Sequence, residues 1–428
     1  MRKLVFEIDA PSLPGLFRPP VYKLTVMVAV IGLIAFMVTG GLPTSGEPES
    51  GKPDAAPGGD DVCIACHSGS TPGIIAQFAS SKKARAGVTC KDCHEVTGDY
   101  PGGKEHMGTH IVSSPTPAIC GKCHPSEVTQ YYQSRHSAPA YTAMRGVEGL
   151  TASQLEMYRN IPEGSFAPDK ERNALYGLEG EGVTRFACHG CHDIGKPQAD
   201  GSIGQCQKCH LRHEFSLEQV RKPETCNACH IGPDHPQWEI YEESPHGIAY
   251  MSLGHKWNWE AEPGTLTATD FPAPTCAICH MSGFGGSGST HDVGERLTWY
   301  LFASKSERRP AWEENRTRMQ DVCRSCHNEN FVNGFYADAD KATEAVNAWV
   351  DESNSIMAPL KESKLLTAAQ FDEPIDFAYF ELWHHWGRTA KFGCWMQGAD
   401  YVQWHGAYEI LKGLKELREM AAQKQKVQ

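Results

Sequence analysis

The first apolar run of the chain is long and lies close to the N-terminus. Residues 24–42 (LTVMVAVIGLIAFMVTGGL) contain no charged side chain, and as a helix rising about 1.5 Å per residue they nearly span a hydrocarbon core about 30 Å thick. Residues 1–23 before this run contain two arginines and two lysines, and a positive flank of this kind stays in the cytoplasm. The pattern therefore predicts a cytoplasmic arm (1–23) and a transmembrane signal-anchor helix (24–42), with the remainder exported.

A cleaved signal peptide is the alternative interpretation of this run. Signal peptides have a shorter apolar stretch and end at an A-x-A-like site, and no such site follows residue 42. We expect the anchor to be retained, which gives a single-pass protein of the inner (cytoplasmic) membrane whose main part is periplasmic. Residues 43–60 (PTSGEPESGKPDAAPGGD) predict a flexible linker, because this composition cannot bury a core.

The pattern of apolar residues changes again after the linker. Over 61–337, short helical stretches alternate with Gly and Pro turns, and no long window shows the alternation typical of strands. Over 338–428, apolar residues recur at helical spacing, as in KATEAVNAWVDESNSIMAPL and YEILKGLKELREMAAQK. We predict a mainly α fold with a cysteine-rich domain (61–337) and a C-terminal helical region (338–428) of long helices.

Cysteine spacing is the strongest chemical signal in the chain. Of the 17 cysteines, 16 fall in eight C-x-x-C-H units. A disulfide framework has no use for a histidine after every second cysteine. The units are Cys63-Cys66-His67, Cys90-Cys93-His94, Cys120-Cys123-His124, Cys188-Cys191-His192, Cys206-Cys209-His210, Cys226-Cys229-His230, Cys276-Cys279-His280 and Cys323-Cys326-His327.

This spacing suits the covalent attachment of haem c. Two thiols three positions apart reach the two vinyl groups of one haem, and the following imidazole binds the iron. Zinc sites also use C-x-x-C pairs, but eight pairs that each precede a histidine argue against a zinc or iron–sulfur array. We predict a multihaem cytochrome c with eight covalently attached haems, whose porphyrins form much of the core. Haem c is attached outside the cytoplasm, which agrees with the exported orientation.

Twelve of the 20 histidines lie outside the units and are candidates for second axial ligands. An electron conduit would use eight of them, whereas an enzyme would leave one iron open to its substrate. Twelve candidates permit either arrangement, so the count does not decide between a conduit and an enzyme.

At this point the chain resembles the octahaem hydroxylamine oxidoreductase family over about residues 61–415. The resemblance rests on the number and order of the units and on three stretches: CHIGPDHPQWEIYEESPHG (229–247), THDVGERLTWY (290–300) and ELWHHWGRTAKFGCWMQGADYVQWHGAYE (381–409). It implies a mainly helical homotrimer, with haems in contact across subunits, that acts on a small inorganic nitrogen compound.

The resemblance also implies an open catalytic haem at Cys188, Cys191 and His192. Asp234 and His235 match an Asp-His pair that the family places beside this haem. The chemistry agrees, since a histidine held by a carboxylate is a suitable proton donor near neutral pH. In the alternative interpretation, Asp234 caps a helix and His235 binds another iron.

Further site residues come from the same resemblance. Tyr300 matches a pocket tyrosine, although an aromatic ring packed against a porphyrin is the alternative. The remaining irons would each have two histidine ligands. The favoured distal ligands are His110, His136, His189, His213, His246, His255 and His291, with His106, His384, His385 and His405 in reserve.

The direction of catalysis is a separate question. Oxidising members of the family carry a tyrosine of a neighbouring subunit cross-linked to the catalytic haem, and Tyr379, Tyr401 and Tyr408 are the candidates here. The compact C-terminal region resembles the reducing members more, and a membrane anchor suits electron delivery by a membrane quinol-oxidising cytochrome. We therefore favour reduction of nitrite or hydroxylamine to ammonium. The alternatives are oxidation of hydroxylamine or hydrazine, reduction of sulfur oxyanions and a non-enzymatic electron conduit.

The net charge and the one cysteine outside the units add little to these predictions. A formal charge of −12 argues against nucleic acid as a partner, because nucleic acids bind basic surfaces. Cys394 lies outside the units, and we expect it to be buried and inert or near the place that a cross-linking residue would reach.

Overall fold

Short helices position the C-x-x-C-H units. The computed structural model describes residues 62–161, 167 and 169–426, and in this part of the chain each unit begins in a helix or a single helical turn. The elements that contain the first cysteine of each unit are α2 (Val62–Ser70), α5 (Cys90–His94), α6 (Pro117–Cys120), α11 (Cys188–His192), the 3-10 turn η2 (Cys206–Lys208), α13 (Glu224–Asn227), α16 (Cys276–His280) and α17 (Trp312–Arg324).

Other short elements connect the units. They are α3 (Pro72–Ser80), α4 (Lys82–Arg85), α7 (Pro125–Gln133), α8 (Ala138–Arg145), α9 (Ala152–Arg159), α10 (Ala174–Thr184), η1 (Asp193–Gly195), α12 (Leu217–Arg221), α14 (Gln237–Glu243), α15 (Pro245–Leu253) and η3 (Gly254–Lys256). Strands β1 (Lys104–His106) and β2 (Thr109–Ile111) form an antiparallel hairpin with His106 opposite Thr109. The described chain is thus mainly α, as predicted.

Threonine residues precede the unit helices α5, α6 and α16, and at α5 and α16 side-chain hydrogen bonds cap the helix. At α5 the N–H of Thr89 donates to Asp92 Oδ2 at 2.7 Å, and at α16 the N–H of Ile278 donates to Thr275 Oγ1 at 3.4 Å. Such caps satisfy polar groups that the first turn of a helix leaves without partners. They hold the first cysteine of the unit at a defined place in the turn.

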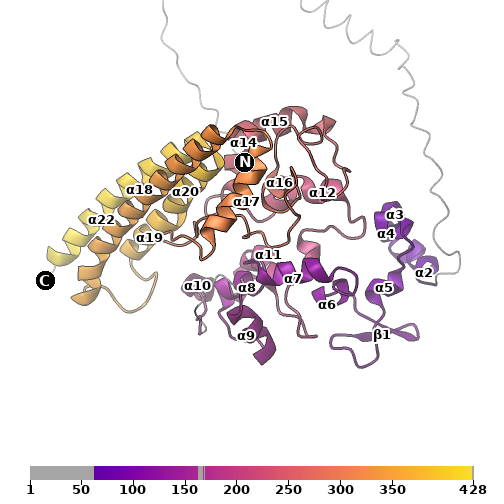
Figure 1. The fold of residues 1–428 in the computed structure, drawn as a ribbon. Coiled ribbons are helices and arrows are strands. Elements are labelled where there is room, and N and C mark those ends of the chain that lie inside the picture. The colour runs from indigo at the N-terminus through magenta and orange to yellow at the C-terminus, as the bar shows by residue number, and fades with distance from the viewer. Residues whose placement is uncertain (1–61, 162–166, 168, 427–428) are drawn as a thin grey trace, which may run out of the picture. The chain divides into compact units, whose positions relative to one another are not determined.

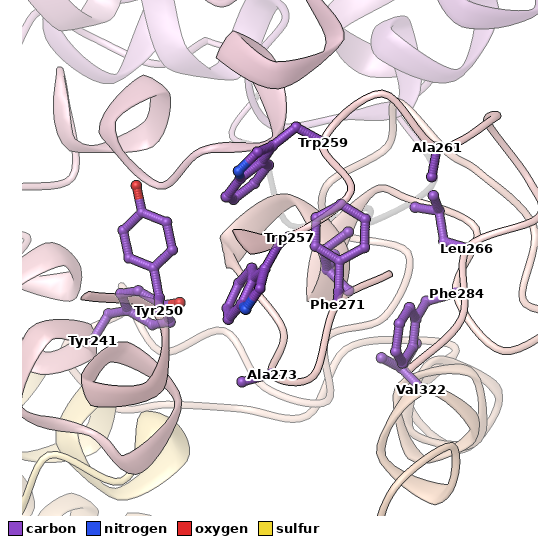
Figure 2. Packing of buried hydrophobic residues seen from close by; sticks show 11 residues of the cluster. Tyr241, Tyr250, Trp257, Trp259, Ala261, Leu266, Phe271, Ala273, Phe284 and Val322 are labelled. Atoms are coloured by element: carbon purple, nitrogen blue, oxygen red, sulfur yellow. The ribbon is translucent and has the colours of Figure 1, made fainter. Parts of the chain in front are cut away.

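The chain builds an aromatic core of its own beside the seventh unit (Figure 2). The rings of Trp257, Trp259 and Phe271 have centroids 5.4–6.0 Å apart, and Phe271 meets both indoles nearly edge-on. Ile278, inside the seventh unit, is fully buried in the same cluster. Aromatic pairs in this arrangement stabilise a core beyond the area that they bury, so porphyrins are only one source of buried apolar surface. The buried members are Tyr241, Tyr250, Trp257, Trp259, Ala261, Leu266, Phe271, Ala273, Ile278, Phe284 and Val322.

The C-terminal region forms a bundle in which α18 (Glu329–Glu362), α20 (Gly387–Met396) and α22 (Tyr408–Lys426) lie side by side (Figure 1). The connecting elements are α19 (Pro374–Glu381), the π-helical turn η4 (Leu382–Trp386), α21 (Ala399–Val402) and the π-helical turn η5 (Gln403–Ala407). Val346, Leu382, Ile410 and Leu414 form part of the buried seam.

Two local features fix the geometry of this bundle. The helix expected from about residue 338 begins at Glu329, because Asn328 caps it by accepting the N–H of Phe331 at 3.0 Å. A Cβ at Gly406 would lie 2.7 Å from the Cβ of Ala390. Only glycine therefore lets η5 approach α20 so closely.

The membrane anchor and linker predicted for residues 24–42 and 43–60 lie outside the described residues. Across the described ranges, no helix combines the length and the apolar character needed to cross a bilayer.

Candidate functional site

Three unit histidines are oriented by hydrogen bonds at Nδ1. His94 Nδ1 lies 2.8 Å from Val112 O, and His192 Nδ1 lies 2.7 Å from Ala140 O. A carbonyl oxygen only accepts, so each Nδ1 carries the proton and each Nε2 is left with a free lone pair. His67 Nδ1 makes a similar contact with the hydroxyl of a threonine at 2.8 Å. This is the tautomer that an iron-binding histidine needs, and the partner fixes the ring orientation.

Five unit histidines face a second histidine across a nearly constant gap. When two imidazoles bind one metal ion from opposite sides, each nitrogen lies about 2 Å from the metal and about 1.1 Å from the centre of its own ring. The two ring centroids are then about 6 Å apart. Such pairs therefore have the spacing of two axial ligands of one iron. The ring centroids are separated by 6.2 Å for His67–His106, 6.2 Å for His94–His213, 5.9 Å for His230–His136, 6.3 Å for His210–His291 and 6.1 Å for His327–His246.

Three predicted distal ligands do not face a unit histidine in the described part of the chain. His189 Nε2 lies 2.8 Å from the hydroxyl of Tyr176, the His110 ring lies against Gly98, and His255 is exposed. None of these three histidines makes a ring contact with a unit histidine within the described residues. The hairpin instead brings His106 to His67.

Three unit histidines, His124, His192 and His280, likewise make no contact with a second histidine ring in the described part of the chain. Of these, His192 lies in the electrostatic field of the predicted Asp-His pair. Burial lowers the pKa of His192, and the charges of His235 and Asp234 also act on it.

Thiols of different units lie next to one another. Hydrogen bonds between thiols connect the third unit with the fifth, the fourth with the sixth and the sixth with the seventh. The thiol pairs are Cys120–Cys206, Cys191–Cys229 and Cys226–Cys276. All 17 cysteines are free of disulfides, so the 16 unit thiols are available for thioether bonds. Haems attached at neighbouring thiols would lie close enough for electrons to pass between units.

Large apolar side chains are exposed beside the units. Leu211 and Ile231, which directly follow unit histidines, are 56% and 50% exposed, and Phe186, two residues before Cys188, is 86% exposed. Apolar side chains at these positions are suited to pack against the faces of porphyrins, and this packing would remove the side chains from water. The residues present thus fit covalently bound haem in ligand geometry, thiol chemistry and apolar surface.

Asp234 and His235 form a close pair between α13 and α14. His235 Nδ1 lies 2.5 Å from Asp234 Oδ2. The His235 ring lies 6.3 Å from the ring of His230 and is edge-on to it, whereas His136 lies nearer to His230, at 5.9 Å. Burial alone would raise the pKa of Asp234, but the neighbouring imidazoles of His235 and His384 and the charge of Arg388 bring it well below its ordinary value. Asp234 is therefore a permanent carboxylate near neutral pH, and any proton donated by this pair comes from His235.

The structure adds two residues of the C-terminal region to this pair. Arg388 Nη1 donates to Asp234 Oδ1 at 2.6 Å, and His384 Nδ1 lies 2.8 Å from the same oxygen. Sequence reasoning held His384 in reserve as an iron ligand and did not consider Arg388. The signal available was the four-residue spacing of His384 and Arg388 in WHHWGR, which places them on one face of a helix.

Tyr300 and Phe302 occupy one loop but have different neighbours. The guanidinium groups of Arg135 and Arg309 lie 4.2 Å and 4.9 Å from the ring centre of Tyr300. Phe302 packs against His235 with ring centroids 4.8 Å apart. Among the described residues, Phe302 therefore contacts the Asp-His pair through the ring of His235.

The candidate cross-linking tyrosines lie on the C-terminal bundle. The Tyr379 hydroxyl donates to Asn354 Oδ1 at 2.6 Å, Tyr401 packs against His405, and Tyr408 is 48% exposed. Burial raises the pKa of the Cys394 thiol to about 11, so this thiol stays protonated and unreactive.

Comparison with known proteins places these features in context. A family model described as "Seven times multi-haem cytochrome CxxCH" matches residues 86–374. A probable nitrite reductase-hydroxylamine oxidoreductase fusion protein of Kuenenia stuttgartiensis is 28% identical over 253 residues, which cover 52% of this chain and 25% of that protein. The chain thus spans about a quarter of the length of that curated relative.

Two solved structures share the fold. A hypothetical multiheme protein has a TM-score of 0.73 at 22% identity, covering 85% of this chain and 95% of that chain. A chain of a Kuenenia stuttgartiensis reducing HAO-like protein complex has a TM-score of 0.62 at 19% identity, covering 86% of this chain and 85% of that chain.

Proposed function

The chain belongs to the multihaem cytochrome c family, and from this premise we propose that it is an octahaem enzyme that reduces nitrite or hydroxylamine to ammonium. The haem bound at Cys188, Cys191 and His192 would supply the redox chemistry. The other seven haems, one at each remaining C-x-x-C-H unit, would carry electrons to it. Relatives named as nitrite reductase-hydroxylamine oxidoreductase and reducing HAO-like proteins support this substrate class.

The observation that carries the proposal is the combination found at the fourth unit. His192 makes no contact with a second histidine ring among the described residues, and the Asp234–His235 pair acts on it electrostatically. The fourth unit also adjoins the segment that leads to this pair, because Cys191 Sγ lies 4.0 Å from Ala228 O. An open iron beside a proton donor is what a multi-electron, multi-proton reduction needs.

Five axial ligand pairs follow from the histidine geometry. We assign His106, His213, His291, His136 and His246 as the distal ligands of the first, second, fifth, sixth and eighth units, in that order. The distal ligands of the third and seventh units come from the remaining histidines, among which sequence reasoning favours His110, His189 and His255. Iron with two imidazole ligands suits electron transfer rather than substrate binding.

The two residues of the pair have different tasks. Asp234 accepts hydrogen bonds as a fixed carboxylate. It holds the Nδ1–H of His235, which leaves Nε2 to take up a proton from water and then pass it to the bound nitrogen compound.

The cellular setting belongs to the proposal as well. An N-terminal anchor at residues 24–42 would hold the enzyme on the periplasmic face of the cytoplasmic membrane, where a quinol-oxidising cytochrome can supply electrons. A homotrimer would bring haems of neighbouring subunits together. A redox partner is in keeping with the description of one structural relative as a protein complex.

Spectroscopy of the purified holoprotein tests the proposal. We expect one high-spin haem that binds hydroxylamine or nitrite in anaerobic electronic and EPR spectra, together with nitrite- or hydroxylamine-dependent oxidation of a reduced dye. His235→Gln should lower the turnover rate by about 10²–10⁴-fold, the usual contribution of a general acid. The absence of any high-spin haem would leave only the electron conduit.

Tyr408 favours one alternative, the oxidation of hydroxylamine. It is exposed on the bundle and packs against Trp404, so it is accessible to a neighbouring subunit. A pyridine haemochrome spectrum separates the two directions. Eight ordinary haems c support reduction, and seven plus one abnormal haem support oxidation.

A further inference from the structure

The carboxylate of Asp234 is shared between two groups of partners. Its Oδ2 faces His235 Nδ1 at 2.5 Å. Its Oδ1 accepts a hydrogen bond from Arg388 Nη1 at 2.6 Å and lies 2.8 Å from His384 Nδ1. One oxygen thus serves the Asp-His pair, and the other faces the C-terminal region, where Arg388 lies 154 residues further along the chain.

Arg388 also reaches the other side of His235. Its Nε donates to Phe302 O at 2.8 Å, and the Phe302 ring packs against the His235 ring at 4.8 Å. The fork of one guanidinium therefore holds both the carboxylate and the aromatic residue that flank His235. A lysine could not do this, because its ammonium is a single point.

His384 is held in one tautomer by the same arginine. Arg388 has no acceptor, so His384 Nε2, which lies 2.8 Å from Arg388 Nη1, must accept from it. The proton of His384 is then on Nδ1, which lies 2.8 Å from Asp234 Oδ1 without the alignment of a hydrogen bond. Burial lowers the pKa of His384 to about 4, so His384 is neutral near pH 7.

The rest of α20 strengthens these ties. Thr389 Oγ1 donates to Pro233 O at 3.4 Å, directly before Asp234. Lys391 Nζ donates to Ala303 O at 3.0 Å and to Ser306 Oγ at 2.8 Å, beyond Phe302 in the same loop. Both segments that surround His235 are thus attached to one helix.

We propose that Arg388 and His384 are positioning residues of the reaction: Arg388 holds the Asp234 carboxylate and Phe302, and His384 orients Arg388, so that His235 presents Nε2 to the molecule bound at the fourth haem unit. This inference rests on the proposed function, because it assumes that His235 faces the substrate. The C-terminal bundle is then part of the active site, although it contains no C-x-x-C-H unit.

Carbon monoxide bound to the reduced holoprotein tests this inference without turnover. The C–O stretching frequency reports hydrogen bonds beside the bound molecule. We expect His235→Gln to shift the band. Arg388→Gln should shift it in the same direction, and Arg388→Lys should restore part of the shift. Turnover with hydroxylamine should fall about 10–100-fold in Arg388→Gln, mainly in kcat, as is usual for residues that orient a metal site.

A second set of variants, at His384, tests the same inference if the Arg388 variants do not fold. His384→Gln retains a donor and an acceptor and should leave the band in place, whereas His384→Leu should move it. The matched control is Arg418→Gln, which breaks an exposed ion pair with Glu352 in the same bundle and should change neither the band nor kcat.

Two results would overturn the inference, and they are distinguishable. If no iron binds carbon monoxide, or if His235→Gln leaves the band in place, the proposed function fails and the inference fails with it. If His235→Gln moves the band while Arg388→Gln and His384→Leu do not, the proposed function stands and the positioning role alone is wrong.

Discussion

Lys391 shows what a single buried charge does in this fold. Its side chain is fully buried, and within the described residues its ammonium donates to two carbonyl oxygens and one hydroxyl. Burial lowers its pKa to about 7, and the charge of Arg388 contributes. The neutral acceptors satisfy the hydrogen bonds of the ammonium but do not balance its charge.

This burial predicts a pH-dependent stability. The folded-state pKa lies below that of lysine in an unfolded chain, about 10.4. Between about pH 7 and pH 10 the unfolded state binds more protons, so raising the pH stabilises the folded state. Lys391→Met removes this contribution. Thermal scans would measure the difference in unfolding temperature between the wild type and Lys391→Met. This difference, wild type minus variant, should therefore increase from pH 7 to pH 10. A difference that stays flat would contradict the shifted pKa.

The hairpin histidines give a second test at this scale. His106 lies 6.2 Å from His67, whereas His110 on the paired strand lies against Gly98. His106→Ala should remove one axial ligand and add one high-spin haem to the EPR spectrum. Thr109→Ala, opposite His106 on the paired strand, is the matched control and should add none. An unchanged spectrum in His106→Ala would contradict the assignment of His106.

At the scale of elements, the bundle depends on the seam between α18 and α22. Leu414 is buried there beside Val346 and Leu382, and Leu411, three residues earlier, is 51% exposed. Leu414→Ala should destabilise the protein by about 2–5 kcal/mol, because it leaves a cavity. Leu411→Ala should cost less than about 0.5 kcal/mol. Denaturant unfolding followed by far-UV circular dichroism measures both, and equal effects would mean that the seam is wrongly placed.

The same elements show how far periodicity predicts structure. The apolar spacing in KATEAVNAWVDESNSIMAPL predicts the helix that became α18, but its start at Glu329 depends on the cap at Asn328. The π-helical turn η4, which carries His384, was not predicted. A π-turn inserts one extra residue per turn, and no spacing in the sequence shows whether packing will favour it.

At the scale of the whole molecule, haem content tests the assignment of the fourth unit. The chain has eight C-x-x-C-H units and one cysteine outside them. Replacing Cys188 and Cys191 by alanine should leave seven haems by intact mass and abolish carbon monoxide binding. Cys394→Ala is the control and should retain eight haems and bind carbon monoxide. A double variant that still binds carbon monoxide would place the open iron at another unit.

The sequence by itself determined the chemistry of this protein, because haem attachment is local: two cysteines and a histidine within five residues suffice. The mainly α class and the helical C-terminal region were also readable, since both follow from short-range periodicity. The Asp234–His235 pair could be proposed from the family resemblance, because its two members are neighbours in sequence and match as one short motif.

Only the tertiary structure decided which distant residues meet. It brought His106 rather than His110 to His67, and it brought His384 and Arg388 from the C-terminal bundle to Asp234. Such contacts depend on how helices pack, and packing is set by many side chains acting together rather than by any local motif. That is why the sequence predicted the haem units individually, whereas the surroundings of the candidate catalytic unit came from the fold.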